Sequence, residues 1–193
     1  MRSAFVALLL LTACAAEPHA TTAMSRSTLF DFSDPAAARV WRNVDDVVMG
    51  GVSSSRFEQR DGHACFTGTV SLENNGGFAS VRCTPEGLDL RGADALELDL
   101  QGDGHTYKLS VRLDGDFDGV SYQTNFTPRA GERSTVRIAF SELVPMWRGR
   151  RVPDASPFDP ARAAQLGLVI GDKQSGPFEL RLFSMRASRV ESR

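Results

Sequence analysis

Beyond residue 27 the sequence is a series of short runs in which apolar and polar residues alternate, and Gly, Asp and Asn interrupt the runs. A period of two turns one face of a strand toward a core and the other toward solvent, so the pattern predicts β-strands. Asp61-Gly62 and Asn74-Asn75-Gly76-Gly77 supply turn residues that accept positive φ. The predicted strands are Thr28–Phe32, Val52–Gln59, His63–Leu72, Phe78–Cys83, Ala95–Gln101, Tyr107–Leu113, Ser121–Phe126, Ser134–Phe140, Leu168–Ile170 and Phe178–Ala187.

One short helix is predicted between the last strands. Asp159 is a suitable N-cap, Pro160 suits the first helical position, and Gly167 suits the end. A turn at Pro35–Val40 is the other helical candidate. Many short strands with one short helix predict a mostly-β fold, a two-sheet β-sandwich or jelly roll.

The N-terminal residues predict export. Arg2 precedes the apolar run Ala4–Leu11, which has the length of a signal-peptide core and is too short to cross a bilayer. The run ends in a small residue before Cys14, the form of a bacterial lipoprotein cleavage box, in which the cysteine receives a lipid. The sequence therefore predicts a signal peptide at 1–13, a flexible tether at 14–27 and one folded domain at 28–189. The protein would be lipid-anchored in the cell envelope, facing the periplasm or exterior. The alternative is an ordinary secretory signal cut near Ala16 or Ala20.

Composition narrows the class of partner. Hydrophobic residues make up 41% of the chain, enough for a core, and 22 basic residues nearly balance 24 acidic ones. This balance argues against a nucleic-acid surface or a polybasic membrane patch, so the membrane would be met through the lipid anchor only. Three histidines, His19, His63 and His105, lie in separate segments and make no zinc ligand set. No metal or cofactor is predicted.

The two remaining cysteines predict a disulfide in an exported protein. If the turn is centred near Asn74, Cys65 and Cys83 are equidistant from it and face each other on adjacent strands. Cross-strand Cβ atoms lie about 4.5–5.5 Å apart, near the separation that a disulfide needs. The alternative is two buried thiols.

Four segments rich in glycine and acidic or polar residues depart from ordinary strand patterns. In order, they are Trp41–Ser53, Gly68–Arg82, Phe140–Arg150 and Gly167–Phe178. In this order and spacing they resemble the complex I intermediate-associated protein 30 family, and the resemblance extends over about Phe30 to Ala187. It implies a β-sandwich of galactose-binding-like type, which agrees with the strand pattern.

The resemblance also implies a role. Mitochondrial members of the family are assembly factors that help to build respiratory complex I. An export signal would place this domain outside the cytoplasm, away from that work, so the fold transfers better than the role. Ala139 stands where the family tends to have a proline, before Phe140-Ser141.

The four segments together predict a site for a ligand or partner at loops and strand ends. Carboxylates and amides there would hydrogen-bond sugar hydroxyls or a peptide backbone. Phe78 or Trp41 would supply an apolar platform, and the paired glycines would let a partner approach the backbone. The alternative is a structural loop network, with both aromatic rings in the core. The predicted binding residues are Asp45, Asp46, Asn74, Asn75, Phe78, Arg82, Asp172, Lys173 and Gln174.

Three functions compete. The first is a non-catalytic binding or scaffolding domain for a glycan, an envelope component or a protein client. The second is an assembly factor or chaperone, which the resemblance alone implies. The third is a carbohydrate-active enzyme using Asp45 and Asp46, which is disfavoured because adjacent side chains on an extended chain point in opposite directions.

One segment matches the start of a calcium loop. Asp114, Asp116 and Asp118 occupy positions 1, 3 and 5 of that pattern, and Gly119 occupies position 6. Position 12 is Asn125 instead of the closing Glu, and the flanks are predicted strands instead of helices. A solvated acidic hairpin tip is therefore the favoured interpretation.

Overall fold

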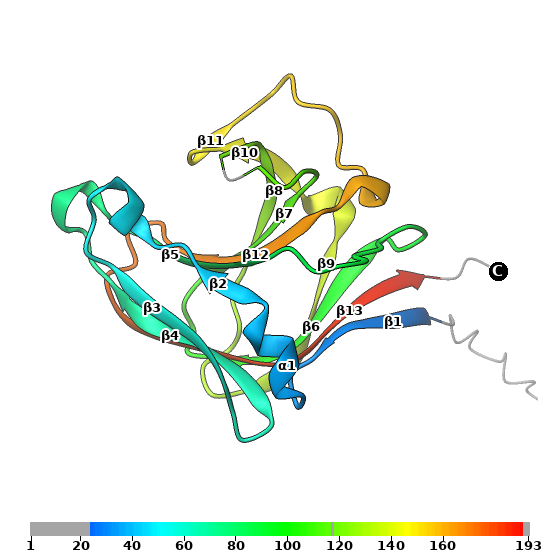
Figure 1. Ribbon diagram of the computed structural model, residues 1–193, viewed down its shortest axis with the longest axis horizontal. Coiled ribbons are helices and arrows are strands. Elements are labelled where there is room, and N and C mark those ends of the chain that lie inside the picture. The colour runs from blue at the N-terminus through cyan, green and yellow to red at the C-terminus, as the bar shows by residue number, and fades with distance from the viewer. Residues whose placement is uncertain (1–23, 117, 191–193) are drawn as a thin grey trace, which may run out of the picture.

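The computed structural model of the protein describes residues 24–116 and 118–190. The predicted signal peptide, Cys14 and residues 14–23 of the predicted tether lie outside this range. Within it, two antiparallel sheets pack face to face, as the strand pattern predicts (Figure 1). The fold is a mostly-β two-sheet sandwich, which confirms the predicted class.

The first sheet has six strands. β3, β4, β13, β6 and β9 follow one another across it, and β1 also pairs with the long strand β13. Met24 pairs with Val190, so the sequence from Met24 to Ser27 is part of β1 although it was assigned to the tether. The bounds are β1 Met24–Asp31, β3 Ser54–Arg60, β4 His63–Val70, β6 Ala95–Gly102, β9 Arg133–Ala139 and β13 Gly176–Val190.

The second sheet has seven strands in the order β11-β10-β8-β7-β12-β5-β2. It curves from β2 round to β11, and its concave side faces away from the first sheet (Figure 1). The bounds are β2 Trp41–Asn43, β5 Ala79–Cys83, β7 Tyr107–Arg112, β8 Ser121–Phe126, β10 Val144–Trp147, β11 Arg150–Arg151 and β12 Gln165–Ile170. The short strands β2, β10 and β11 escaped prediction because they have too few residues to show alternation.

The core lies between the sheets and is formed by alternate residues of each strand. Leu96, Leu98 and Leu100 of β6 are fully buried, and so are Leu166 and Leu168 of β12. Trp41 is also in this core, where its ring lies 5.2 Å from that of Phe57. Trp41 is therefore a packing residue and not an apolar platform.

The helices are short, and the helix predicted after Asp159 is shorter than expected. After Asp159 there is a single 3-10 turn, η4 (Pro160–Arg162), although Asp159 caps it by accepting from the Ala161 N–H at 2.9 Å. The Ala164 N–H donates to the Arg112 carbonyl and draws the chain into the sheet, so β12 begins at Gln165. In the described part of the chain the one α-helix is α1 (Pro35–Arg39), capped by Asp34, where a turn was the expectation. The other 3-10 turns are η1 (Asp46–Met49), η2 (Glu73–Asn75) and η3 (Phe140–Glu142).

The predicted disulfide between Cys65 and Cys83 is wrong, and both thiols are free. The Asn74–Gly77 segment does not close a hairpin, because β4 belongs to the six-stranded sheet and β5 to the seven-stranded sheet. Cys83 faces the core, where burial raises the pKa of its thiol to about 11. Cys65 alternates with the core residues Ala64 and Phe66 and faces the other side of its sheet.

Candidate functional site

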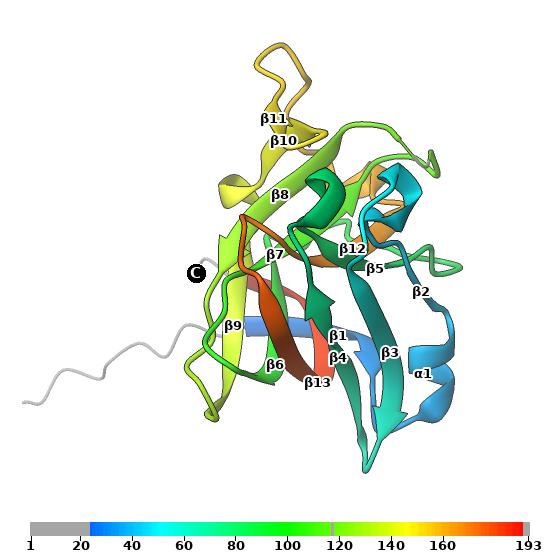
Figure 2. The ribbon, with the colours of Figure 1, turned by 90° about the vertical axis from the view of Figure 1, so that its left-hand side faces the viewer.

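Three of the four motif segments meet at one end of the sandwich. The β2–β3 connection with η1, the β4–β5 connection with η2 and the β12–β13 connection lie at the left of Figure 1 and face the viewer in Figure 2. The remaining segment, Phe140–Arg150, runs into β10 and β11 at the opposite edge of the seven-stranded sheet from β2. The structure therefore places three of the four segments at one end and the fourth elsewhere.

Asp46 joins the first two segments. Its side chain is fully buried, and its carboxylate accepts from the Ser53 N–H at 2.9 Å, the Ser53 hydroxyl at 2.6 Å, the Gly77 N–H at 2.6 Å and the Phe78 N–H at 3.2 Å. Burial acts to raise the pKa of Asp46, but these hydrogen bonds to the ionised form outweigh it, and the pKa is lowered. Asp46 is therefore a structural anion that holds two loops together.

The neighbouring glycines make room for this carboxylate. A Cβ added at Gly51 or Gly76 would collide with the Asp46 carboxyl group. Gly50 ends η1 at φ 91°, a conformation that side chains disfavour. The motif glycines thus serve the packing of Asp46, whereas the sequence suggested that they admit a partner.

Asp45 joins the two sheets. Its carboxylate accepts from the Ser55 N–H at 2.8 Å and the Ser55 hydroxyl at 2.7 Å on β3, and from the Ser80 N–H at 3.1 Å on β5. The carboxylates of Asp45 and Asp46 thus both accept hydrogen bonds from groups of the protein itself. The geometry supports the structural interpretation of Asp45 and Asp46 and gives no support to their use as a hydrolytic pair.

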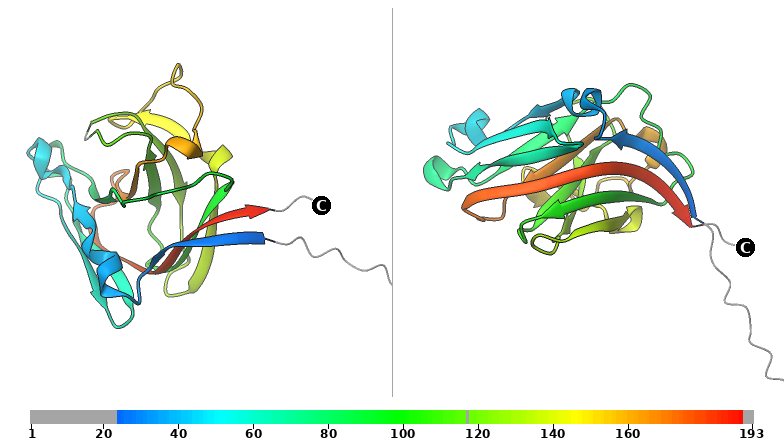
Figure 3. Two further views of the ribbon diagram at one scale, coloured as in Figure 1. Left: turned by 45° about the vertical axis from the view of Figure 1, so that its right-hand side comes forward. Right: turned by 90° about the horizontal axis from the view of Figure 1, so that it is seen from below.

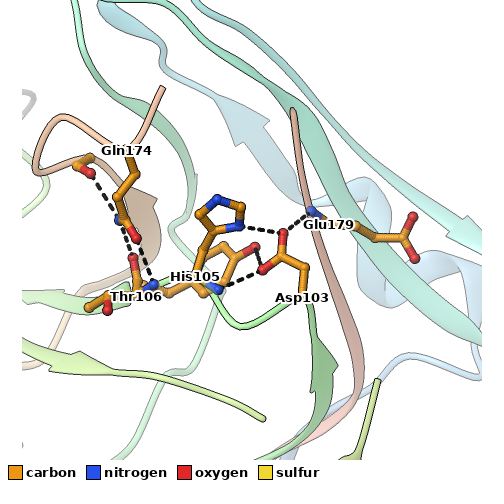
Figure 4. Close-up of polar contacts among 7 residues, drawn as sticks. Asp103, His105, Thr106, Gln174 and Glu179 are labelled. Carbon is orange, nitrogen blue, oxygen red and sulfur yellow. Dashed lines mark hydrogen bonds and ion pairs between the residues drawn. The ribbon is translucent and has the colours of Figure 1, made fainter. Parts of the chain in front are cut away.

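The β12–β13 connection is also held by side chains. The Gln174 amide accepts from the Thr106 N–H and donates to the Thr106 carbonyl, both at 2.8 Å, as a strand neighbour would (Figure 4). Lys108 Nζ donates to Asp172 Oδ1 at 2.6 Å. Asp172 and Lys173 both have positive φ, at 56° and 62°. Gln174 and Asp172 therefore shape the loop.

Asp103 is a further functional side chain of this end, and sequence reasoning did not predict it. Its carboxylate accepts from the Glu179 N–H at 2.7 Å, and from the His105 N–H and the Tyr107 hydroxyl at 3.0 Å each (Figure 4). His105 Nδ1 lies 2.9 Å from Asp103 Oδ2. Burial acts to raise the pKa of Asp103, and the hydrogen bonds outweigh it and lower the pKa. Its position between two glycines was the available signal.

The anchored loops present apolar side chains to solvent. The described residues include eight exposed large hydrophobic side chains, and five of them lie on these loops. Their exposed fractions run from 45% to 65%. We call this surface the apolar end; it consists of Val47, Val48, Met49, Val52 and Leu72. The sequence offered one signal for it, an apolar run placed between Asp45-Asp46 and Gly50-Gly51 without strand periodicity.

The other predicted binding residues are divided between surfaces. Asn74 and Asn75 are exposed at φ 55° and 60° in the turn of η2, beside the apolar end. Phe78 is half-buried and packs beside Gly171. Arg82 lies on β5, among residues that face the concave side of the seven-stranded sheet. The nine predicted residues therefore do not form one polar surface.

The acidic segment after β7 engages the β10–β11 tip. Arg148 forms an ion pair with Asp118, which lowers the pKa of that carboxyl group, and Trp147 Nε1 donates to the Asp118 carbonyl at 3.1 Å. Asp114 Oδ1 accepts from the Asp116 N–H at 3.2 Å. Within 24–116 and 118–190, no group of three or more His, Cys, Asp or Glu side chains is arranged to hold a metal ion.

The architecture defines a class, a β-sandwich of galactose-binding-like type. Residues 30–182 match the family of complex I intermediate-associated protein 30, and the chain belongs to that family. A relative from Schizosaccharomyces pombe, the uncharacterized protein C9E9.15, is 32% identical over 168 residues, covering 76% of this chain and 77% of that protein.

Solved structures agree on the fold. The family 11 carbohydrate-binding module of the cellulosomal cellulase Lic26A-Cel5E of Clostridium thermocellum superposes with a TM-score of 0.66 at 16% identity, covering 89% of this chain and 99% of the module. A family 11 module from the same organism, in complex with a β-1,3-1,4-mixed-linked tetrasaccharide, gives 0.65 at 16% identity, covering 86% and 98%. At this identity the likeness establishes the fold.

Proposed function

We propose that this chain is a non-catalytic binding domain that holds a protein partner at its apolar end. The observation that carries the proposal is the arrangement of Val47, Val48 and Met49, more than half exposed on a turn whose first residue is the buried Asp46. The family is named for association with a complex I intermediate. An exposed apolar surface on fixed loops suits association with a protein.

The energetics favour a docking surface. Burying an aliphatic side chain completely is worth roughly 1.5–3 kcal/mol, so five half-exposed side chains offer several kcal/mol to a partner. Because Asp45 and Asp46 fix the loops beforehand, little conformational entropy is lost on binding. A rigid, exposed apolar cluster of this kind is typical of a surface that binds another protein.

We propose further that the chain is exported and lipid-anchored at Cys14. Met24 and Val190 pair at the end of the sandwich opposite the apolar end (Figure 3). An anchor ten residues before Met24 would reach at most about 35 Å, so the domain would stay close to the membrane. No helix of residues 24–116 and 118–190 is long and apolar enough to cross a bilayer.

Substitution at the apolar end tests the proposed partner. A photoreactive residue at position 48 should crosslink in cells to one defined protein, and adding Met49→Asp should abolish the adduct. The matched control is Val40→Asp, because Val40 is 47% exposed on the C-cap of α1, away from these loops. If Val40→Asp reduced the adduct as strongly, or if position 48 gave none, the proposed surface would be wrong.

The anchor has its own test. Replacing Cys14 with Ser should move the protein from the detergent-extracted membrane fraction to the soluble fraction, with the thermal unfolding of the domain unchanged. Membrane retention of the Cys14→Ser variant would contradict a lipid anchor at this position.

A further inference from the structure

β9 is an outermost strand of the six-stranded sheet and pairs with β6 alone (Figure 2). The Phe140 N–H at its end donates to the Asp94 carbonyl at 2.8 Å, so this pair belongs to the hydrogen-bonded set. Bonded and non-bonded pairs alternate between antiparallel strands, so every second residue of β9 directs its N–H and C=O groups away from β6. The residues in question are Arg133, Thr135, Arg137 and Ala139.

Most of these outward backbone groups have no partner. The Ala139 N–H donates to the Glu142 carboxylate at 3.2 Å. Within residues 24–116 and 118–190, the outward groups of Arg133, Thr135 and Arg137 form no hydrogen bond. We call this surface the β9 edge; it consists of the outward N–H and C=O groups of these three residues.

The other outermost strands have features that hinder pairing with a further strand. β2 and β11 have three and two residues, β1 is broken by a bulge, and β3 packs against α1 and β2. β9 has seven residues, no proline and no shift of register. Its arginines pair with carboxylates of the described chain, Arg133 with Asp99 at 2.8 Å and Arg137 with Asp94 at 2.5 Å. β9 is therefore a long outer strand that is open to pairing.

The C-terminal end of β9 leads into a groove that the fourth motif segment helps to form. The groove has a volume of about 830 Å³ and lies between the end of β9, the residues that follow it and the loop 153–160. Four prolines and two phenylalanines make up much of its wall. Phe140 and Leu143 are buried, and the Phe140 ring lies 5.1 Å from that of Phe158. The groove therefore offers an apolar surface next to the β9 edge.

The groove also carries one uncompensated positive charge. Its charged lining residues are Asp94, Arg137 and Arg151. Asp94 and Arg137 form an ion pair, whereas Arg151 is exposed and forms no ion pair within the described residues. Asp154 belongs to the adjoining loop but does not line the groove. This combination suits a ligand that has an apolar side chain beside an acidic one.

We infer that the β9 edge and this groove together bind an extended segment of a partner protein. The segment pairs with β9 through its backbone, places an apolar side chain against Phe140 and Phe158, and places an acidic one at Arg151. Backbone pairing supplies affinity, and the groove selects the sequence. Val190 also lines the groove and lies opposite the apolar end, so this is a second surface and not the docking surface proposed above.

Selection from a random heptapeptide library displayed on phage, with the full chain as bait, tests the inference. We expect enriched peptides to place an apolar residue next to Asp or Glu. Only every second backbone N–H of an added strand faces β9. An enriched peptide should therefore bind at least tenfold more weakly when one alternate set of N–H groups is methylated, and normally when the other set is. The Val48→Asp and Met49→Asp variants should bind the peptide normally, which separates this result from the first proposal.

Variants of the chain locate the site. Thr135→Pro removes an outward N–H and leaves the hydrogen bonds to β6 in place, because proline is tolerated on the free side of an edge strand. It should weaken peptide binding at least tenfold, whereas the control Thr135→Ala should leave binding unchanged. Arg151→Gln should weaken binding about threefold to fivefold, as expected for an exposed ion pair. Its control is Arg150→Gln, a neighbouring exposed arginine that does not line the groove. The methylated peptides remain decisive if Thr135→Pro does not fold.

Three results would overturn the inference. One is a selection that enriches no peptide on the chain over the bare support. Another is an equal effect of the two methylated peptides, which would show that binding does not use strand pairing. The last is sedimentation of the chain as a dimer that Thr135→Pro dissociates, which would assign the β9 edge to a second copy of this chain.

Discussion

The apolar end and the β9 edge are held in place by opposite means. The apolar end consists of loops, and its shape depends above all on the buried carboxylate of Asp46, which accepts from backbone N–H groups where no strand ladder exists. The β9 edge lies on a continuous β-ladder, so its backbone is fixed before any side chain is considered. Side-chain hydrogen bonds determine the shape of the first surface, whereas backbone hydrogen bonds determine the shape of the second.

This difference explains why the sequence motifs mark residues that hold the loops and not the residues that would contact a partner. The acid–glycine segments are conspicuous because a loop needs unusual residues to fold into one conformation. Asp46, Gly51 and Gly76 are scaffold, and the exposed valines beside them are the contact surface. On a sheet no such scaffold is needed, so contact residues there leave no motif.

The largest effect is expected from removing the scaffold. Asp46→Ala should lower the free energy of unfolding by about 3–4 kcal/mol, because the buried N–H groups of Ser53, Gly77 and Phe78 lose their acceptor. Urea denaturation measures this. Crosslinking at position 48 should be lost in the same variant, while peptide binding at the β9 edge should survive below its melting temperature.

The matched control is Glu73→Ala, an exposed acid in the same loops, which should change stability by no more than about 0.5 kcal/mol. A loss below about 1 kcal/mol in Asp46→Ala would mean that the carboxylate does not organise this end, and the comparison between the two surfaces would fail.

The same carboxylate predicts a pH dependence. The folded-state pKa of Asp46 is lower than its unfolded value, so its stabilising contribution is complete above the unfolded pKa of about 4 and is lost as pH falls through the folded pKa. The stability difference between the wild type and Asp46→Asn should therefore shrink on acidification below pH about 4. A difference that stayed constant from pH 7 to pH 3 would contradict the lowered pKa.

A smaller effect is expected at the β12–β13 connection. Gln174→Ala removes both hydrogen bonds to the Thr106 backbone and should cost about 1–2 kcal/mol in thermal or urea unfolding. Lys173→Ala is the control. Lys173 is exposed, and alanine carries a Cβ as lysine does, so the strain of the φ of 62° is the same in both. Equal losses in the two variants would contradict a specific role of the Gln174 amide in this loop.

The sequence predicted the strands well because alternation is a local signal. Leu96, Leu98 and Leu100 are spaced as a half-buried strand requires, and they are in the core. Strand partners are not local, so the assumption that β4 and β5 form a hairpin led to the wrong disulfide. For the same reason the helix expected after Asp159 gave way to β12, where pairing with β7 outweighed a good N-cap.

The candidate site was predictable only as far as loop composition went. Asp45, Asp46 and Gln174 were found, but whether a polar side chain binds a ligand or its own backbone depends on which N–H groups the fold brings near. Of the arginines on the concave side, Arg82 alone was among the predicted residues, and Arg42 and Arg112, which are far from it in sequence, lie near it only through the strand register.

The smallest effect is expected at Arg42, where one substitution should raise stability. Arg42 faces Arg82 across the β2–β5 ladder, so Arg42→Glu replaces a like-charge pair by an opposite-charge pair. Arg42→Gln is the reference, because it removes the same guanidinium hydrogen bonds to backbone carbonyls without adding an acid. Arg42→Glu should be more stable than Arg42→Gln by about 0.5 kcal/mol at low salt, and the gap should close as salt rises. Peptide binding at the β9 edge should be the same in both variants, because β2 and β9 belong to different sheets. Equal stability of the two variants at low salt would contradict a repulsion between Arg42 and Arg82.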